Sequence, residues 1–350
     1  MVSKINQPLI SKMKAMVAKK GWFSRILELR EVKIPQLKDD EVLIKVCATG
    51  VNRGDIIDVA TSDNSVCPGL ECSGIIEAVG RNITCWKVGE RVCALLEGRG
   101  YAEQVAVPAN CLLPLPDDID LDVAAALPYA SCSIWLALFR MSDPESLKDK
   151  SILIREGASG IGALAIQYAK YMGFKVIVTT GSSEHFSICH TYGADTCIDH
   201  TLELYPPDRK LKLGALSDFV YAVRRTTKFS EGVDFVVDYG ASNLRNNVQC
   251  CRPGGKVVIL DLFGTGCNSV DLAKLQEKHI EIRAFDLRYR DLDYKASVIA
   301  KVRTHLWPFI LQQKVIPFVK HRFPMIEAQK ALNLLKKNGC SREDYCVYGF

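Results

Sequence analysis

A glycine-rich loop in the middle of the chain is the strongest chemical signal in the sequence. An apolar run at 151–155 leads into the loop GASGIG at 157–162, and an amphipathic helical pattern follows. Glycines let a backbone approach a pyrophosphate closely, and a helix N-terminus offers free N–H groups and a positive dipole end. Ser159 replaces the second glycine of the G-x-G-x-x-G fingerprint. The loop still predicts a dinucleotide site, with close packing of a helix as the alternative.

The end of the next apolar run bears on the choice between NAD and NADP. NAD sites usually carry Asp or Glu about 20 residues after the loop, where it bonds the ribose hydroxyls. Gly181 lies 19 residues after Gly162 (181 − 162), and Ser182 and Ser183 follow it without a carboxylate. Because a carboxylate there would repel the 2′-phosphate of NADP, the sequence favours NADPH over NADH. Glu184 is close enough in sequence to reverse that preference.

The elements that must position this loop change character along the chain. Short β-rich runs such as EVLIKVCATGV from Glu41 and YAEQVAVP from Tyr101 dominate the first 125 residues. From Lys150 onward, uninterrupted apolar runs alternate with helical patterns, which indicates a parallel sheet covered on both faces. A strand, a helix and a final strand from Ile316 are expected to return to the first domain. The polar segment at 205–217 is predicted to be a surface insertion.

Composition excludes several classes of protein. The 350 residues suggest two domains, and 48% hydrophobic with 24% charged residues is typical of a globular protein. The sequence contains no uninterrupted run of 18 apolar residues, so a membrane-spanning helix is not expected. The net charge of +5 is modest, and acidic and basic residues are interleaved along the sequence. A concentrated basic surface is therefore not expected, and neither is nucleic-acid binding. Without a signal-peptide pattern, we interpret the 14 cysteines as reduced thiols of a cytoplasmic protein. The acid-free first 27 residues leave a transit peptide as the alternative.

Zinc-binding patterns are missing from the N-terminal part of the sequence. All six histidines lie at position 185 or later, and no Cys-x-x-Cys occurs. A Cys/His ligand set for a catalytic zinc is therefore not available locally, and we expect no metal.

The order of the motifs resembles the zinc-independent quinone oxidoreductases of the medium-chain dehydrogenase/reductase superfamily, and in particular their tumour-suppressor-inducible branch. The matching pieces include VNRGD, PGLECSGIIEAVG, WKVGERV, GASGIGALAIQYAK, RPGGKVV and LRYRDLDYK. The resemblance implies an α/β protein with a chaperonin-cofactor-like β-rich catalytic domain at 1–127 and 314–350. It also implies a Rossmann domain with a doubly wound parallel sheet at 128–313 that binds NADP, and a homodimer.

The resemblance also implies which residues hold the cofactor. In the Rossmann domain these are Ser133, Ala158, Ser159, Gly160, Ile161, Gly162, Gly181, Ser182, Tyr239, Gly240, Leu260, Leu262, Phe263, Leu287 and Arg288. Two departures weaken the phosphate site, because His185 replaces a lysine of the family and His200 replaces a tyrosine. Histidine is mostly neutral near pH 7, so NADPH binding is expected to be weaker and favoured by acid. The alternative is a pair of ordinary surface histidines.

The resemblance places the nicotinamide end near VNRGD. There Asn52 is the candidate hydrogen-bond donor, Asp55 fixes the loop or caps a helix, and Arg53 is a weaker candidate. Leu70 takes the place of a zinc-binding histidine in the metal-dependent relatives. The family's tyrosine loop is missing before the Pro-Gly turn, and Asp261 stands where a glycine is usual, without an assigned role.

Two functions follow as hypotheses. The first is an NADPH-dependent reductase that transfers hydride to a quinone, a reactive carbonyl or an enone without zinc, because the cofactor carries the hydride and the protein positions the acceptor. The alternative is a protein of the same fold that binds the cofactor with little or no turnover. Besides a small-molecule acceptor and a second copy of the chain, no partner is expected.

Overall fold

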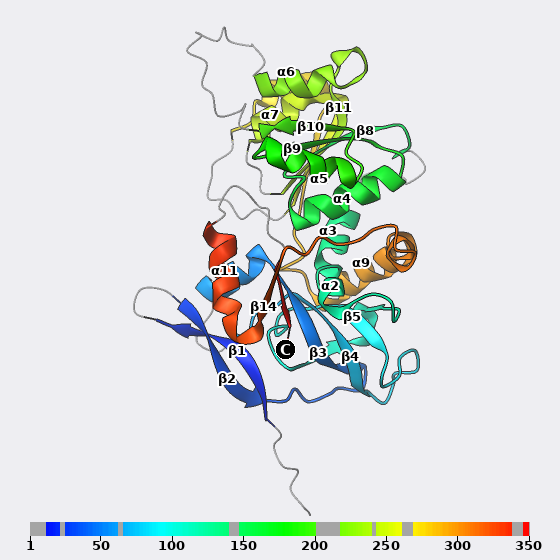
Figure 1. Cartoon of the computed structure of the whole chain (residues 1–350). Coiled ribbons are helices and arrows are strands. Elements are labelled where there is room, and N and C mark those ends of the chain that lie inside the picture. Colours follow the sequence, from blue (N-terminus) through cyan, green and yellow to red (C-terminus); the bar gives the residue numbers. More distant parts are fainter. Residues whose placement is uncertain are drawn as a thin grey trace, which may run out of the picture. The chain divides into compact units, whose positions relative to one another are not determined.

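The computed structural model describes most of the chain (Figure 1). It covers residues 12–21, 25–61, 66–139, 147–200, 218–239, 243–260, 269–337 and 346–349. Three expected site positions, Gly240, Leu262 and Phe263, lie outside the described residues, as do Asp261 and the expected insertion at 205–217.

The chain divides into two compact units, and each is described by itself. Unit 1 comprises Met1–Pro128, Arg322–Asn333 and Cys346–Phe350, and unit 2 comprises Tyr129–His321 and Leu334–Tyr345. The first boundary falls one residue beyond the boundary expected from the sequence. The C-terminal return to unit 1 begins at Arg322 rather than at 314.

Unit 1 is built from antiparallel strands around β3 (Glu41–Val51). This strand pairs with β4 (Glu71–Val79), β6 (Gln104–Pro108) and β15 (Cys346–Gly349). Alternating apolar residues of β3 are buried, which is why the segment forms a strand with one face in the core. The other elements that fall wholly or mostly in this unit are β1 (Lys12–Lys20), β2 (Arg25–Lys33), α1 (Arg53–Thr61), β5 (Arg91–Leu95), η1 (Ala109–Cys111), β7 (Leu112–Pro114), α2 (Leu121–Ala124), β14 (His321–Pro324), η6 (Met325–Glu327) and α11 (Ala328–Lys337).

Unit 2 contains a six-stranded sheet in which every pair is parallel. Its strands are β8 (Ser151–Ile154), β9 (Lys175–Thr180), β10 (Thr196–Asp199), β11 (Val233–Tyr239), β12 (Cys251–Leu260) and β13 (Glu281–Phe285). They lie in the order β10-β9-β8-β11-β12-β13, which is the third, second, first, fourth, fifth and sixth strand of the sheet. This is the strand order of the Rossmann fold. The order in which the strands are added to the sheet reverses between β8 and β11.

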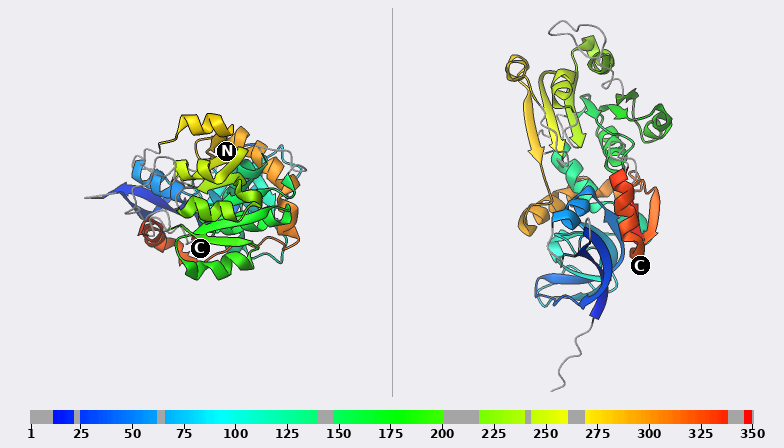
Figure 2. Two further views of the ribbon diagram at one scale, coloured as in Figure 1. Left: turned by 90° about the horizontal axis from the view of Figure 1, so that it is seen from above. Right: turned by 90° about the vertical axis from the view of Figure 1, so that its left-hand side faces the viewer.

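Helices cover both faces of this sheet (Figure 2). Leu153 and Ile177 belong to a buried cluster with Phe219 of α6 (Asp218–Arg225) and Val248 of α7 (Leu244–Cys250). The strand residues on either side of Leu153 and of Ile177 point to the opposite face of the sheet. They are fully buried as well, so that face is also covered. The other helices mostly within the unit are α3 (Pro128–Leu138), α4 (Gly160–Tyr171), η3 (Ser183–His185), α5 (Phe186–Thr191), η5 (Lys228–Ser230), α8 (Leu272–Lys278), α9 (Leu292–His305) and α10 (Trp307–Leu311). Expectations of an α/β protein with a doubly wound sheet are confirmed.

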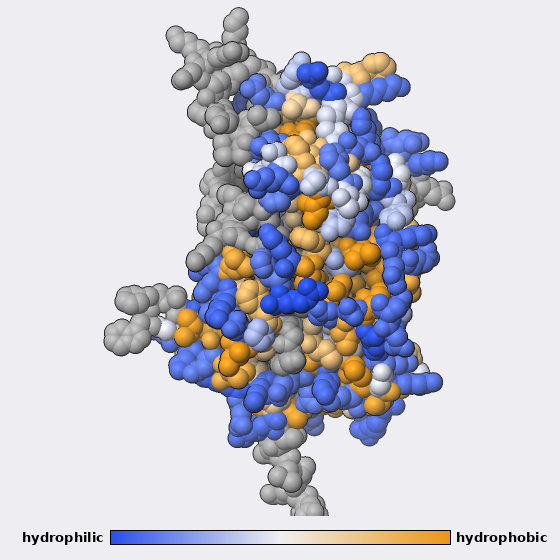
Figure 3. All heavy atoms as spheres, viewed as in Figure 1, coloured by the Kyte–Doolittle hydropathy of each residue, from blue (hydrophilic) through white to orange (hydrophobic). Residues whose placement is uncertain are grey.

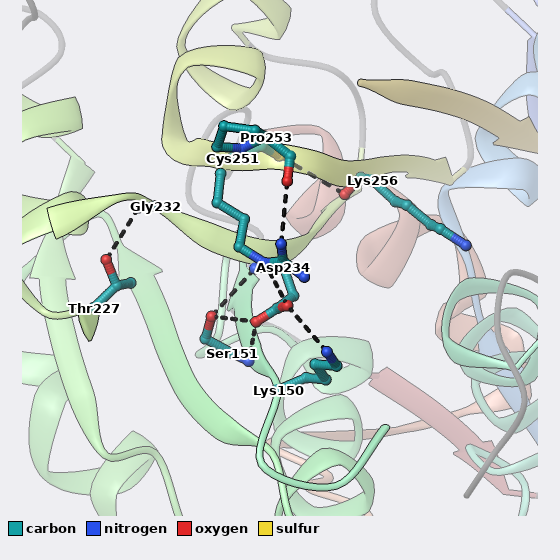
Figure 4. A network of polar contacts seen from close by, with 9 residues as sticks. Lys150, Ser151, Thr227, Gly232, Asp234, Cys251, Pro253 and Lys256 are labelled. Atoms are coloured by element: carbon teal, nitrogen blue, oxygen red, sulfur yellow. Dashed lines mark hydrogen bonds and ion pairs between the residues drawn. The ribbon is translucent and has the colours of Figure 1, made fainter. Parts of the chain in front are cut away.

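A carboxylate ties three strands of unit 2 together at their amino ends (Figure 4). Asp234 Oδ2 accepts hydrogen bonds from the backbone N–H and the hydroxyl of Ser151, each at 2.8 Å, and Asp234 Oδ1 accepts from Arg252 Nε at 2.7 Å. Burial alone would raise the pKa of Asp234, but these donors outweigh it and hold the pKa below its ordinary value. The network lies at the sheet edge opposite the carboxyl ends, so it stabilises the scaffold.

One described stretch, Leu121–Leu138, is long and apolar enough to cross a membrane by length and composition alone. Because 78% of it is buried within the structure, it has the surroundings of a core helix, and it is weak evidence for a span. On the face seen in Figure 3, hydrophilic residues are interspersed with smaller hydrophobic groups.

Candidate functional site

The glycine-rich loop lies at the carboxyl end of β8, where the strand order reverses. Backbone hydrogen bonds anchor it to both neighbouring strands: Arg155 N donates to Val237 O of β11 at 2.9 Å, and Gly157 N donates to Thr179 O of β9 at 2.8 Å. In open α/β sheets, ligands bind in the crevice at this reversal. The structure therefore puts the loop where a Rossmann domain binds a nucleotide.

Ser159 explains the departure from the glycine fingerprint, because it is the N-cap of α4. Its hydroxyl accepts from Gly162 N at 3.0 Å and donates to Glu156 O at 2.8 Å, so the serine closes the helix start. Gly162 is required for packing, since a Cβ there would lie 2.2 Å from Glu156 O. The packing alternative therefore accounts for Gly162.

Two N–H groups at the start of α4 remain without an acceptor. Ser159 N, Gly162 N and Ala163 N all bond within the loop or the helix cap. Within the described chain, the N–H groups of Gly160 and Ile161 have no such partner. Free first-turn N–H groups together with the helix dipole suit a phosphate. These atoms fit the pyrophosphate of a dinucleotide.

The carboxyl end of β9 brings Gly181, Ser182 and His200 into one corner. Ser182 caps η3 by accepting from Glu184 N at 3.2 Å. A Cβ at Gly181 would lie 3.3 Å from Cε1 of His200, so the ring packs directly against that glycine. His185 is the last residue of η3 and directly precedes α5.

A carboxylate that was not predicted from the sequence lies beside this corner. Glu156 follows β8, and its Oε1 lies 3.4 Å from His200 Nδ1 without forming a hydrogen bond. Both side chains are largely buried, and Glu156 has a φ of 58°, a value rare outside glycine. An acid was expected only at the end of the second strand of this sheet. A carboxylate at the end of the first strand was the overlooked signal.

The other expected cofactor residues occupy several places in unit 2. Tyr239 and Leu260 end β11 and β12 and are paired across these strands, so they share the carboxyl edge. Leu287 is buried shortly after β13, and the guanidinium of Arg288 lies 4.8 Å from the ring centroid of Tyr289. Ser133 is buried within α3.

A buried polar cluster in unit 1 holds the VNRGD segment. Asp55 Oδ2 accepts from Asn52 N at 2.7 Å and from the Tyr101 hydroxyl at 3.0 Å, and Asp55 Oδ1 accepts from Gly69 N at 3.1 Å. Asp55 lies in the first turn of α1 and bonds back to the residue before that helix, as in a capping box. It therefore both caps the helix and fixes the loop. Arg53 begins α1.

Burial dominates the electrostatics of this cluster. Desolvation raises the pKa of Asp55 to about 7, although the Asn52 N–H and the Tyr101 hydroxyl partly offset it. Asn52 Nδ2 donates to Glu71 Oε1 at 2.9 Å, and the Thr49 hydroxyl donates to Glu71 O at 2.6 Å. Asp55 thus holds the backbone of Asn52, and the Asn52 side chain is held by a second buried carboxylate.

The donor set of unit 1 does not suit a zinc ion. Leu70 is buried in the core, and the neighbouring Glu71 carboxylate accepts from Asn52. Among the described residues, no three His, Cys, Asp or Glu side chains gather where they could hold a metal.

Comparisons with known proteins support the two-part organisation. The alcohol dehydrogenase GroES-like domain model matches residues 38–117, and the zinc-binding dehydrogenase model matches residues 160–303. A quinone oxidoreductase of Sus scrofa is 32% identical over 243 residues, which cover 67% of this chain and 68% of that protein. Highly-reducing polyketide synthase 1 of Aureobasidium melanogenum is 32% identical over 224 residues, 63% of this chain, and this chain spans only 10% of its length.

Solved structures share the fold at lower identity. The human synaptic vesicle membrane protein VAT-1 homolog-like protein has a TM-score of 0.77 at 23% identity, over 97% of this chain and 99% of that one. Mycobacterial Rv1454c complexed with NADPH has a TM-score of 0.79 at 23% identity, over 97% of this chain and 100% of that one. With the family models and the pig relative, these findings confirm the resemblance seen in the motifs: the chain belongs to the medium-chain dehydrogenase/reductase superfamily, alongside its quinone oxidoreductases.

Proposed function

We propose that this chain is a reductase that binds NADPH in preference to NADH and passes a hydride to a quinone, a reactive carbonyl or an enone without zinc. The observation that carries the proposal is the serine-capped start of α4 at the reversal of strand order, with two N–H groups that have no acceptor among the described residues. Every helix start leaves first-turn N–H groups free, so the position of this one after β8, where the strand order reverses, is what favours a nucleotide over packing alone.

The cofactor would be held along the carboxyl edge of unit 2. The Gly160 and Ile161 N–H groups would bind the pyrophosphate, with Ala158, Ser159 and Gly162 shaping the loop. Gly181, Ser182, His185 and His200 would face the adenosine ribose and its phosphate. The bound form of Rv1454c, with NADPH on the same fold, supports this choice of cofactor.

Hydride transfer needs little chemistry from the side chains. When bound, the nicotinamide supplies the hydride. Asn52 carries two N–H bonds on Nδ2, of which one donates to Glu71, and the other is the proposed donor to the acceptor oxygen. Asp55 holds the Asn52 backbone and so positions that amide. Water is the proposed source of the proton.

The identity of the acceptor rests on the relatives. The pig and rat relatives are quinone oxidoreductases, at 32% and 27% identity. The zinc-free reaction is supported by Leu70 and by the engaged Glu71 carboxylate. We also propose a homodimer, for which β13 forms an edge of the described sheet.

A cofactor-binding protein with little turnover is the second candidate. Tyr101 is the sole tyrosine in unit 1 whose side chain the structure describes, and its hydroxyl donates to the buried Asp55. It is fully buried, so the described part of this unit presents no exposed phenol as a proton donor. This observation favours slow chemistry on substrates that need a protein acid.

A paired binding and turnover experiment separates the candidates. The full chain is titrated with NADPH and NADH by calorimetry, and turnover is measured with NADPH and 1,2-naphthoquinone alongside a panel of enones. Binding with quinone turnover supports the reductase, and binding without turnover over the panel supports the second candidate. A folded chain that binds neither nucleotide would refute both.

A further inference from the structure

Two cysteines meet between a helix and a strand of unit 2. Cys189 lies in α5 and is fully buried, and Cys197 lies in β10 and is partly exposed. Cys197 Sγ contacts the carbonyl oxygen of Phe186 at 3.8 Å, and the neighbouring Cys189 thiol is the largest influence that lowers the pKa of Cys197. Phe186 begins the helix that carries Cys189, so this contact places the strand thiol on the same helix.

The backbone around these thiols is fixed by its own hydrogen bonds. Ala194 N donates to Cys189 O at 3.0 Å, and Asp195 N donates to Val176 O of β9 at 2.8 Å. Asp195 Oδ2 also accepts from Val176 N at 2.8 Å. The short connection from α5 to β10 is therefore held on both sides, which fixes the strand that carries Cys197 beside the helix that carries Cys189.

We propose that Cys189 and Cys197 are a dithiol site that closes reversibly to a disulfide when a peroxide oxidises the protein. A disulfide needs Cβ atoms within about 3.5–4.5 Å of each other, and the placement of Cys197 Sγ against the first turn of the helix that carries Cys189 favours that approach. The bond would join the helix that follows His185 to the strand that precedes His200. It would thus brace the corner proposed to face the adenosine phosphate, but its formation does not depend on the proposed function.

The two thiols have different roles in the reaction. Hydrogen bonding by Cys189 lowers the pKa of Cys197 despite partial burial, and His190 acts in the same direction. In contrast, burial raises the pKa of Cys67 to about 12 and also raises that of Cys47. Because the thiolate is the nucleophile, the partly exposed Cys197 is the thiol expected to meet the oxidant first.

The chemistry balances with hydrogen peroxide as the oxidant. The Cys197 thiolate attacks one peroxide oxygen, the O–O bond breaks, and Cys197 becomes a sulfenic acid while the other oxygen leaves as water. The Cys189 sulfur then attacks the Cys197 sulfur, the S–O bond breaks, and the second water leaves with the Cys189 proton. The dithiol loses two electrons and two protons, and the peroxide is reduced to two waters.

The test uses the full chain and a convenient property of its sequence. Cleavage after Lys175 and Arg209 yields one peptide, 176–209, whose only cysteines are Cys189 and Cys197. The folded protein is treated with hydrogen peroxide, free thiols are alkylated, and the unreduced digest is analysed by mass spectrometry. We expect this peptide to lose two hydrogens and to resist alkylation, and to accept two alkyl groups after reduction with dithiothreitol.

Variants identify the pair. Cys197→Ser is expected to abolish the protected form of the peptide, whereas the matched control Cys85→Ser, at an exposed cysteine, is expected to retain it. The proposal is overturned if peptide 176–209 of the native chain remains fully alkylatable under peroxide that oxidises Cys85. It is also overturned if Cys197 accumulates only sulfinic or sulfonic acid. Neither readout involves a nucleotide, so failure here is distinct from failure to bind NADPH.

Discussion

The proposed phosphate site can be tested by removing one hydrogen atom. Replacing Gly160 with proline deletes an N–H that has no acceptor in the described chain. The local backbone suits this change, because Gly160 is the first residue of α4 and proline is favoured there. The preceding Ser159 has φ −73° and ψ 161°, the extended conformation that a residue before proline prefers. Gly160→Ala is the matched control, since it adds a side-chain atom and keeps the N–H.

The expected magnitude follows from the type of bond that is lost. A hydrogen bond to a charged group contributes about 1.5–3 kcal/mol, which corresponds to about a 10- to 150-fold change in Kd. Gly160→Pro should therefore bind NADPH about 10- to 150-fold more weakly than Gly160→Ala. The free energies of unfolding of Gly160→Pro and Gly160→Ala should differ by less than about 1 kcal/mol, because the proline removes no internal hydrogen bond.

Calorimetric titration with NADPH and NADH measures both affinities, and thermal unfolding without nucleotide checks the fold. Both nucleotides should weaken by a similar factor, because each carries the same pyrophosphate. Equal Kd values for the proline and alanine variants, with both folded, would contradict the placement of the pyrophosphate on this helix start.

Four further changes probe the scaffold and the cofactor corner. Gly162→Ala should lower the free energy of unfolding by about 1–3 kcal/mol in chemical denaturation, because its Cβ would lie 2.2 Å from Glu156 O. Asp234→Asn should cost about 2 kcal/mol at neutral pH. Since the folded pKa of Asp234 is lowered, its contribution is present above about pH 4 and is lost as the pH falls further, which a pH series of unfolding curves tests. The pKa of Asp55 is raised to about 7, so its contribution to the free energy of unfolding should be largest below about pH 4. That contribution, up to about 4 kcal/mol, should be lost as the pH rises through 7. Asp55→Asn should flatten this pH dependence. His185→Lys should increase the preference for NADPH over NADH, measured as the ratio of their Kd values in fluorescence titration, by about 10-fold. The reason is that a permanent positive charge would face the phosphate.

The sequence alone was enough to predict the alternating pattern of unit 2 and the strand–loop–helix of the dinucleotide site. Apolar strands and amphipathic helices have local periodicities that a linear sequence displays. The glycine spacing is equally local, because it reports how one short loop must turn. The family resemblance rests on the same short motifs, and the comparisons confirm it.

The contacts between distant residues were decided by tertiary structure. Ser159 became understandable only as a helix cap, and the approach of Glu156 to His200 joins the ends of two separate strands. Asp55 and Tyr101 lie 46 positions apart, yet the folded unit joins them through a buried hydrogen bond. Such pairs leave no periodic trace in the sequence, because they depend on how the strands are ordered and how closely their ends pack.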